Sequence, residues 1–259
     1  FGGNVSVEDA EVARAAGLEV LEGTVPNSFY ELMLNNETIP SAAVRRAIDL
    51  ALDKEALCLH TAQGLGEPAA SDLTPGTGYD SGLTWARNVD GAKALLAEGG
   101  YDGRTYTLAC TSARASLAAL IQQNLAAVGI QVEIETVDSA TMFAGMNDGT
   151  YDLAVASHTP TTLPLWFTGS RFTPDHNIFR VADLSHYTTL LDAINQETHE
   201  TARIDLVDEF EAYLDQEKPF IPLWFTHALH VQSKTVTGID YPAASCCNEN
   251  VWQWEKTAS

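Results

Sequence analysis

One candidate ligand-binding segment is Thr111-Ser112-Ala113-Arg114, which lies between an alternating apolar segment and a segment with helical spacing. Free backbone N–H groups and the helix dipole at the start of a helix favour a carboxylate or phosphate group. The guanidinium of Arg114 could pair with such a group through two parallel hydrogen bonds. We therefore expect Ser112 and Arg114 to bind an anionic part of a ligand; the alternative is that Arg114 is a solvated surface arginine.

A second candidate segment, residues 158–166, follows an alternating segment that ends at Ser157. It is polar, and its further candidate ligand-binding residues are His158, Thr159, Thr161, Thr162 and Trp166. The alternative is that the polar side chains only satisfy the loop backbone and that the aromatic ring anchors the loop on the protein. No acidic residue lies between Asp152 and Asp175. The segment therefore supplies no counter-charge for a buried ammonium group, whose burial is costly without one.

The other histidines and the cysteines form no recognisable metal motif. His227 and His230 are three residues apart on an expected strand, which places them on opposite faces. Four cysteines allow three full disulfide pairings, which the sequence leaves open: Cys58, Cys110, Cys246 and Cys247. We expect neither a metal nor a cofactor. No GxSxG, HExxH, Walker A or GxGxxG pattern is present, so we expect a binding protein and not an enzyme, with a hydrolase as the remote alternative.

Alternating helical and strand-like segments must position these loops. Strands are expected at Leu18–Val25, Phe29–Leu34, Tyr106–Cys110, Ile130–Val137, Tyr151–Ser157, Phe220–Phe225, His227–Val231 and Val251–Trp254. Helices are expected at Val7–Ala16, after Ser41, after Asp53, from Asn88, from Thr111 or Ser112 to Gly129, from Ser139 to Asp148, at Ser185–Gln196 and at Glu200–Leu214. This alternation is typical of an α/β fold.

The composition indicates a folded and very acidic protein. Of its 259 residues 45% are hydrophobic, and 35 acidic against 14 basic side chains give a formal net charge of −21. Nucleic acids and anionic membranes attract clustered Lys and Arg, so we expect neither as a partner. No apolar stretch approaches the length of a membrane span. The chain begins with neither Met nor a signal-like pattern, so we expect it to be part of a longer protein.

Seven short motifs occur in an order that resembles a known family. They are Val44–Ile48 with Ala51–Leu57, Gly64–Ala69, Ala92–Glu98 with Gly100-Tyr101, Ile121-Gln122 with Leu125, Gly129-Ile130 with Val132, Gly149 with Tyr151-Asp152, and Ile221–Leu223 with Val236 and Gly238. The sequence is therefore similar to the peptide and nickel solute-binding proteins of ABC importers. These proteins form extracellular solute-binding protein family 5, which includes the dipeptide- and oligopeptide-binding proteins.

The resemblance implies a lobe of the periplasmic-binding-protein-like (type II) α/β fold, a mixed sheet flanked by helices, in a protein whose two lobes enclose the ligand. It implies that residues 1–222 form the second, C-terminal lobe. Residues 223–259 would return to complete the first lobe, which would otherwise be absent from this chain. Peptide-binding relatives commonly place an aromatic residue and then an aspartate in the loop after residue 157, where the aspartate neutralises the ligand's amino terminus. This sequence departs from that pattern.

For function, the resemblance implies the solute-binding component of an ABC importer. Such a component binds a peptide or another small solute and delivers it to permease subunits in the membrane. It would be a monomer and extracytoplasmic, in the periplasm or at the cell surface, with a lipid anchor in the full-length protein. The alternative on the same fold is the ligand-sensing domain of a transcription regulator.

Overall fold

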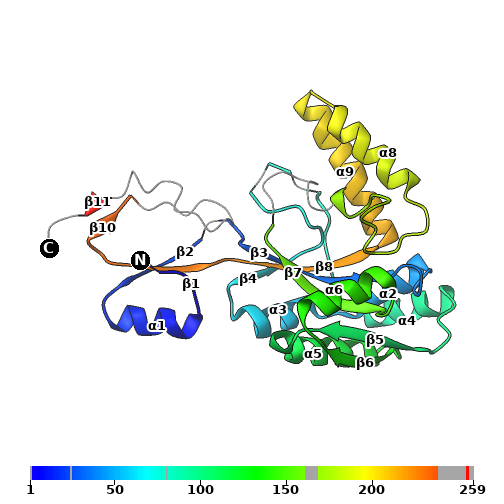
Figure 1. Ribbon diagram of the computed structural model, residues 1–259, viewed down its shortest axis with the longest axis horizontal. Helices are drawn as coiled ribbons and strands as arrows, with labels where there is room; N and C mark the ends of the chain where they lie inside the picture. The colour runs from blue at the N-terminus through cyan, green and yellow to red at the C-terminus, as the bar shows by residue number, and fades with distance from the viewer. Residues whose placement is uncertain are drawn as a thin grey trace.

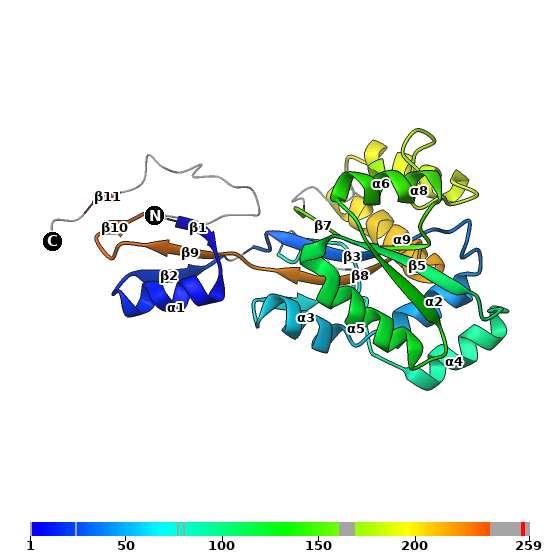
Figure 2. The ribbon, with the colours of Figure 1, turned by 60° about the horizontal axis from the view of Figure 1, so that its bottom comes forward.

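The protein consists of a larger α/β lobe and a smaller unit beside it, which both views of the chain separate clearly (Figures 1 and 2). The structure, a computed structural model, describes residues 2–23, 25–76, 78–79, 81–160, 169–238 and 255–256. None of the helices in this described part of the chain is both long and apolar enough to cross a bilayer.

The lobe is built on a six-stranded sheet with the strand order β4-β8-β3-β7-β5-β6. Its strands are β3 (Ser28–Leu34), β4 (Gly66–Pro68), β5 (Thr105–Cys110), β6 (Gln131–Thr136), β7 (Leu153–His158) and β8 (Phe220–Thr226). β5 runs parallel to β6 and β7, whereas β3 is antiparallel to both β7 and β8, and β4 is antiparallel to β8. The sheet is therefore mixed, and β3 lies inside it with a partner on each side.

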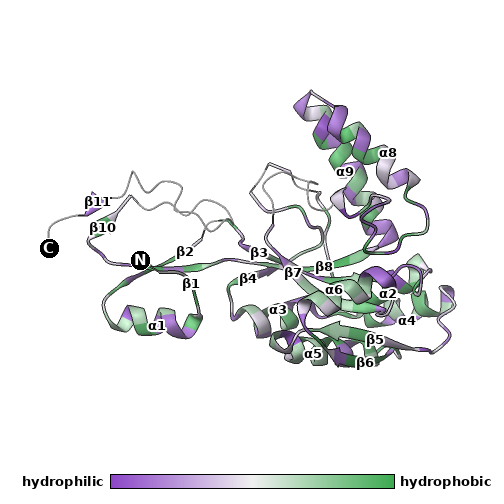
Figure 3. Ribbon diagram, viewed as in Figure 1, coloured by the Kyte–Doolittle hydropathy of each residue, from purple (hydrophilic) through white to green (hydrophobic). Residues whose placement is uncertain are grey.

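Helices cover both faces of this sheet and enclose two separate cores. The first core lies beneath α2 (Ala42–Ala51), α3 (Lys54–Ala62), α4 (Val89–Glu98) and α5 (Ala115–Ala126). The second lies beneath α6 (Ser139–Asp148), α8 (Ser185–Gln196) and α9 (Glu200–Glu217). In Figure 3, α8 and α9 carry both hydrophilic and hydrophobic residues, as helices with one buried face do.

Strand alternation divides the side chains of β3 between the two cores. Leu32 and Leu34 pack into the first core, and Phe29 and Met33 pack into the second. A one-residue shift in the pairing would exchange these sets, so the register of β3 is fixed by burial on both faces.

Polar side chains begin most of the helices. Backbone N–H groups in the first turns of α1, α2, α3, α4 and α6 donate to Ser6, Ser41, Asp53, Asn88 and Asp138, respectively. The helix expected to begin at Thr111 or Ser112 begins instead at Ala115, as α5. A 3₁₀ turn, η1 (Ser112–Arg114), links β5 to α5, and no side chain caps the start of either helix.

The small unit combines the beginning of the chain with a segment near its end. Strands β1 (Gly2–Val5), β2 (Glu19–Glu22) and β9 (Leu229–Gln232) form an antiparallel sheet of order β1-β9-β2, and α1 (Val7–Ala15) packs against it. The short strands β10 (Val236–Thr237) and β11 (Glu255–Lys256) pair with each other.

Most expected elements are confirmed, with boundaries that differ by only a few residues. The helix expected at Ser185–Gln196 coincides with α8, while the strand expected at Leu18–Val25 is shortened to β2. The strand expected at Val251–Trp254 lies outside the described residues. The domain boundary expected at residue 222 falls inside β8, because this strand continues through Thr226 in the six-stranded sheet, and residues 2–22 lie in the small unit.

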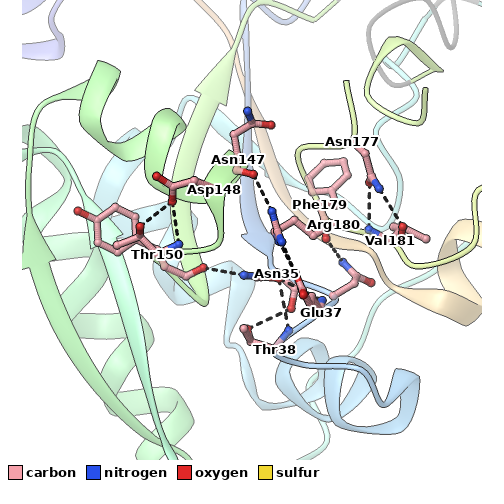
Figure 4. A network of polar contacts seen from close by, with 12 residues as sticks. Asn35, Glu37, Thr38, Asn147, Asp148, Thr150, Asn177, Phe179, Arg180 and Val181 are labelled. Carbon is pink, nitrogen blue, oxygen red and sulfur yellow. Dashed lines mark hydrogen bonds and ion pairs between the residues drawn. The ribbon is translucent and has the colours of Figure 1, made fainter. Parts of the chain in front are cut away.

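Arg180 joins three segments at the end of the lobe where β3 stops (Figure 4). Its Nε donates to Oε2 of Glu37 at 2.6 Å, and its Nη1 donates to the carbonyl of Asn147 at 2.8 Å. Its φ of 54° lies in the left-handed region that residues other than glycine rarely adopt. The buried Asn36 donates to the carbonyl of Phe179 at 3.0 Å. These contacts hold the chain before α8 against α6 and the turn after β3.

A buried group of opposite charges joins α2, α3 and the end of α9. Oδ1 of Asp49 lies 2.8 Å from Nζ of Lys54, and its Oδ2 lies 3.0 Å from Nζ of Lys218. All three side chains are less than a tenth exposed. Burial opposes ionisation of Asp49, but the two ammonium groups hold its pKa below the ordinary value. The Asp49 carboxylate is thus shared by two buried cations, and Asp215 also pairs with Lys218, at 2.5 Å.

We expect Asp49→Asn to destabilise the lobe strongly, because it leaves Lys54 and Lys218 buried without the carboxylate that they share. Breaking a buried charge pair on one side costs about 3–5 kcal/mol. Urea unfolding followed by far-UV circular dichroism measures the loss. Glu37→Gln is the control, because it removes the carboxylate from the ion pair with Arg180, in which the Glu37 side chain is 61% exposed, and should cost less than about 1 kcal/mol. Equal losses in the two variants would contradict the assignment.

Candidate ligand-binding site

Arg114 lies where the 3₁₀ turn after β5 meets the start of α5. Its Nη2 donates to Oγ of Ser157 near the end of β7, at 2.5 Å. Its guanidinium carbon lies 5.8 Å from the centroid of the Tyr30 ring, which stacks on Trp224 at 5.0 Å. The arginine is therefore fixed by a hydroxyl and an aromatic face, and neither contact neutralises its charge.

A cavity of about 280 Å³ opens beside this arginine. Its lining comes from β3, α3 and the region where η1 meets α5: Tyr30, His60, Thr61, Ala113, Arg114, Ser116 and Leu117. The described lining residues include hydroxyl, imidazole and guanidinium groups but no carboxylate. A lining of this kind suits the anionic end of a small ligand.

A second, larger hollow of about 620 Å³ lies at the other end of β3, beside Arg180. That arginine already pairs with Glu37, which also lines the hollow. Its charge is compensated within the protein, so the cavity beside Arg114 is the better candidate for an anionic ligand.

His158, the last residue of β7, points to the other face of the sheet from Ser157. Its ring packs edge-on against Phe29 at 5.1 Å, and its Nδ1 lies 4.0 Å from Oε1 of Glu31. The same carboxylate oxygen accepts a hydrogen bond of 2.6 Å from Nη1 of Arg171, and both side chains of this ion pair are buried. Arg171 also lies over the rings of Phe179 and Phe220, at 4.6 and 5.0 Å.

Burial lowers the pKa of His158 to about 4; the nearby charge of Glu31 opposes this shift and that of Arg171 adds to it. The imidazole is therefore neutral at physiological pH. A neutral ring can accept or donate a hydrogen bond, but it offers a ligand no charge.

Two further carboxyl groups meet on the same face of the sheet. Asp72 shares a hydrogen bond with Glu211 of α9. Burial raises the pKa of both groups; Arg171 opposes the shift of Asp72, and the charge of Asp72 adds to that of Glu211. The pair therefore retains a proton above the ordinary range of carboxylic acids.

The structure brings the two predicted loops together but separates their main side chains. Arg114 reaches the end of β7 on the face of the first core, whereas His158 points to the face of the second. Ser112 and Thr159 are exposed, and neither lines the cavity beside Arg114. Thr161, Thr162 and Trp166 lie outside the described residues, so a ligand role for them stays a prediction.

Sequence reasoning missed three residues around Arg114 and one near His158: Tyr30, His60, Ser157 and Glu31. The alternation of β3 and β7 signals that Tyr30 and Ser157 point to one face and Glu31 to the other. Nothing local in the sequence indicates that His60, near the end of α3, lines a cavity with Arg114.

Among the described residues, no group of three or more His, Cys, Asp or Glu side chains is placed to hold a metal ion. Cys58 and Cys110 are free and buried, and the other two cysteines lie outside this part of the chain.

Comparison with known proteins identifies the relatives of this chain. Residues 4–177 match the model of the bacterial extracellular solute-binding proteins, family 5 Middle. The dipeptide-binding protein DppE of Bacillus subtilis (strain 168) is 23% identical over 229 residues, which are 82% of this chain and 42% of that protein.

Solved structures share the fold. The periplasmic binding protein DppA from Helicobacter pylori, in complex with the peptide STSA, matches with a TM-score of 0.79 and 20% identity over 97% of this chain and 51% of that one. AgaA from A. tumefaciens R10, in complex with agropinic acid, matches with a TM-score of 0.75 and 27% identity over 92% of this chain and 51% of that one. The expected type II binding-protein fold is thereby confirmed, and the chain spans about half the length of these relatives.

We expect His158→Gln to remove a pH dependence of stability. The imidazole has a pKa of about 6.5 in the unfolded chain and about 4 in the folded one. Between these two pH values the unfolded chain therefore binds more protons than the folded chain. The free energy of unfolding of the wild type should therefore fall between pH 7 and pH 5 by about 2 kcal/mol more than that of the variant. Urea unfolding at both pH values measures the difference. The exposed His176→Gln should behave like the wild type, and an unchanged pH dependence in His158→Gln would refute the prediction.

Proposed function

The chain belongs to the bacterial extracellular solute-binding proteins of family 5, and we propose that it binds a small solute, in the first place a peptide, through the surface around Arg114. The supporting observation is the lack of an acidic partner for this arginine in the described part of the chain. Among the described residues no carboxylate lies within ion-pair distance of Arg114, although the protein carries 35 acidic side chains. A half-buried cation left unpaired in so acidic a protein is available for an anion from outside.

The ligand anion would be a carboxylate, such as the free carboxyl terminus of a peptide. Hydroxyl groups of Tyr30, Thr61 and Ser116 and the imidazole of His60 line the cavity and can donate further hydrogen bonds. The relatives illustrate the class of ligand, because DppA from Helicobacter pylori is seen with a peptide and AgaA with agropinic acid.

The amino end of a peptide would find no free carboxylate in the described part of this region. Glu31 lies 4.0 Å from Nδ1 of His158, and its charge is already balanced by Arg171 at 2.6 Å. We therefore infer that the ligand's amine is held from another lobe, or that the ligand is not an ordinary short peptide.

The chain supplies one wall of the binding cleft in this proposal. Its lobe corresponds to the second lobe of a two-lobe protein, and its small unit would complete the first. Support comes from the length of the relatives, of which this chain spans about half. The facing lobe would exclude water from the ligand and contribute much of the buried surface.

The proposed physiological role is delivery of the solute to the membrane permease of an ABC importer. The protein would act outside the cytoplasm as a monomer, anchored by lipid in its full-length form and without catalysis. A ligand-sensing domain of a transcription regulator is the alternative, and a DNA-binding region in the same polypeptide would favour it.

We expect Arg114→Gln to abolish a preference for peptides with a free carboxyl terminus. A hydrogen bond to a charged group contributes about 1.5–3 kcal/mol, so the wild type should bind a free-acid tripeptide at least about tenfold more tightly than its carboxyl-terminal amide. NMR titration of the 259-residue chain with both peptides measures weak affinities directly. Arg46→Gln, an exposed arginine on α2, is the charge-matched control. A preference that persists in Arg114→Gln would count against this site.

We also expect the chain alone to bind peptides weakly, because only one wall of the cleft is present. Isothermal titration calorimetry with a peptide library should detect no submicromolar ligand. The same library against a longer polypeptide that includes the facing lobe should yield tighter binding. Submicromolar affinity of the chain alone would show that this lobe suffices.

A further inference from the structure

Two stretches of chain connect the small unit to the lobe (Figures 1 and 2). The first runs from the end of β2 to the start of β3, and the second is the pair of residues between β8 and β9. The helix and strands of the small unit pack mainly on one another. The orientation of the unit therefore depends on contacts made at this junction.

Backbone hydrogen bonds join the two stretches. The N–H of Gly23 donates to the carbonyl of Ala228, and the N–H of Asn27 donates to the carbonyl of Thr226, both at 2.8 Å. The N–H of His227 donates to the carbonyl of Leu65, also at 2.8 Å, which attaches the second stretch to the residue before β4. The junction thus has a side toward the small unit and a side toward the lobe.

The side chain of His227 bridges these two sides. Its Nδ1 lies 2.9 Å from the carbonyl oxygen of Gly23, and its Nε2 lies 3.6 Å from Oε1 of Glu67 on β4. The ring is 18% exposed, whereas Glu67 is 49% exposed. β4 itself is held against α3, because Gly66 has no Cβ, and one placed there would lie 2.5 Å from Sγ of Cys58.

The two contacts of the ring are attractive at the same time only when the ring is protonated. The carbonyl of Gly23 can only accept, so Nδ1 must carry a proton to bond with it. In a neutral ring Nε2 would then present a lone pair to the carboxylate of Glu67, which repels it. In an imidazolium both nitrogens donate, one to each side of the junction.

Three other titratable groups lie near the ring or the junction, and among the described residues no hydrogen bond or ion pair joins any of them to the His227 ring. His230 of β9 lies beside Gly23, and burial lowers its pKa. Cys58 of α3 is a thiol whose pKa is raised to about 11 by burial and by the charge of Glu67. Glu22, at the end of β2, is exposed. Glu67 is therefore the carboxylate that distinguishes the two charge states of His227.

We propose that protonated His227 is a positioning residue for the junction, where it ties the carbonyl of Gly23 to the carboxylate of Glu67 and holds the small unit at one angle to the lobe. Loss of the proton keeps the bond to Gly23 and releases Glu67, so the range of angles widens. Lowering the pH favours the protonated ring and its two contacts, and raising the pH favours the release of Glu67.

The consequence for ligand binding rests on the proposed function. If the small unit completes the facing lobe, its angle to the larger lobe sets how far the cleft opens. The contacts of His227 with Gly23 and Glu67, here called the clasp, would loosen as the pH rises, and the range of cleft openings would then widen.

The test measures the angle without any ligand. Spin labels attached at Glu11→Cys on α1 and Lys93→Cys on α4, both exposed positions, report the distance between unit and lobe by pulsed electron paramagnetic resonance. Cys246 and Cys247 are replaced by Ser so that they take up no spin label. Cys58 and Cys110 are kept, because they are buried. We expect a narrow distance distribution at pH 5.5 and a broader or shifted one at pH 8.0.

Three variants separate the clasp from a general effect of pH. In Glu67→Gln the amide can accept from or donate to the ring, so the distribution should stay narrow at both pH values. In His227→Gln it should be broad at both. Glu22→Gln removes an equal charge at the same junction and should respond to pH as the wild type does. A wild-type distribution that is the same at both pH values, or a pH response retained in Glu67→Gln, would overturn the proposal.

A second measurement addresses the ring itself. The ¹⁵N signals of His227 should report two protonated nitrogens at pH 5.5 and, at pH 8.0, a neutral ring whose proton is on Nδ1. A neutral ring with its proton on Nε2 would contradict the clasp. Neither measurement uses a peptide, so failure here leaves the proposed function standing, and failure of the peptide titrations leaves the junction result standing.

Discussion

The buried charge of Glu31 is the constraint on which much of the lobe depends. This carboxylate lies on a strand inside the sheet and is 1% exposed, and an uncompensated charge there would cost several kcal/mol. Arg171 compensates it at 2.6 Å and is itself held over Phe179 and Phe220. The pair therefore fixes the chain that follows β7 against the central strand. It also fixes the environment of His158, which packs beside the same carboxylate.

The alternation of β3 assigns different chemistry to the two faces of the sheet at the candidate site. Tyr30 contributes an aromatic face to the cavity beside Arg114, while its neighbour Glu31 faces the second core with its charge balanced. One face thus offers a cation that has no carboxylate partner among the described residues, and the other offers a neutral imidazole. In the proposed function, this asymmetry makes the acidic end of a ligand the part that the lobe recognises by charge. In the same proposal, an amine would be recognised from elsewhere.

The sequence was sufficient for the fold but not for the site. Helices and strands followed from local spacing and capping residues, because a buried face leaves a periodic pattern in any one segment. The order of short motifs added the family. Arg114 was also predicted locally as a ligand-binding residue, since it lies at the junction of a strand and a helix, and its ligand role stays a prediction. The ion pair of Glu31 and Arg171 could not be found in this way, because 140 residues separate its members and each is unremarkable in its own segment. His60 was missed for the same reason. Its exposure is compatible with any surface helix, and only the packing of α3 beside α5 makes it part of a cavity.

The net charge of −21 is easier to interpret once the basic side chains are located in the structure. Several of the 14 basic side chains are occupied inside the protein: Lys54 and Lys218 with Asp49, Arg171 with Glu31, and Arg104 with Asp152. Each of these pairs compensates an acid that the fold has buried. Arg114 differs, because its described partners are a hydroxyl group and an aromatic ring. Acidic side chains outnumber basic ones more than twofold in this protein, yet the described residues that line the cavity beside Arg114 include no acid. The absence of acids from the described lining of this cavity is therefore the feature on which the proposed selection of an anionic ligand by Arg114 depends.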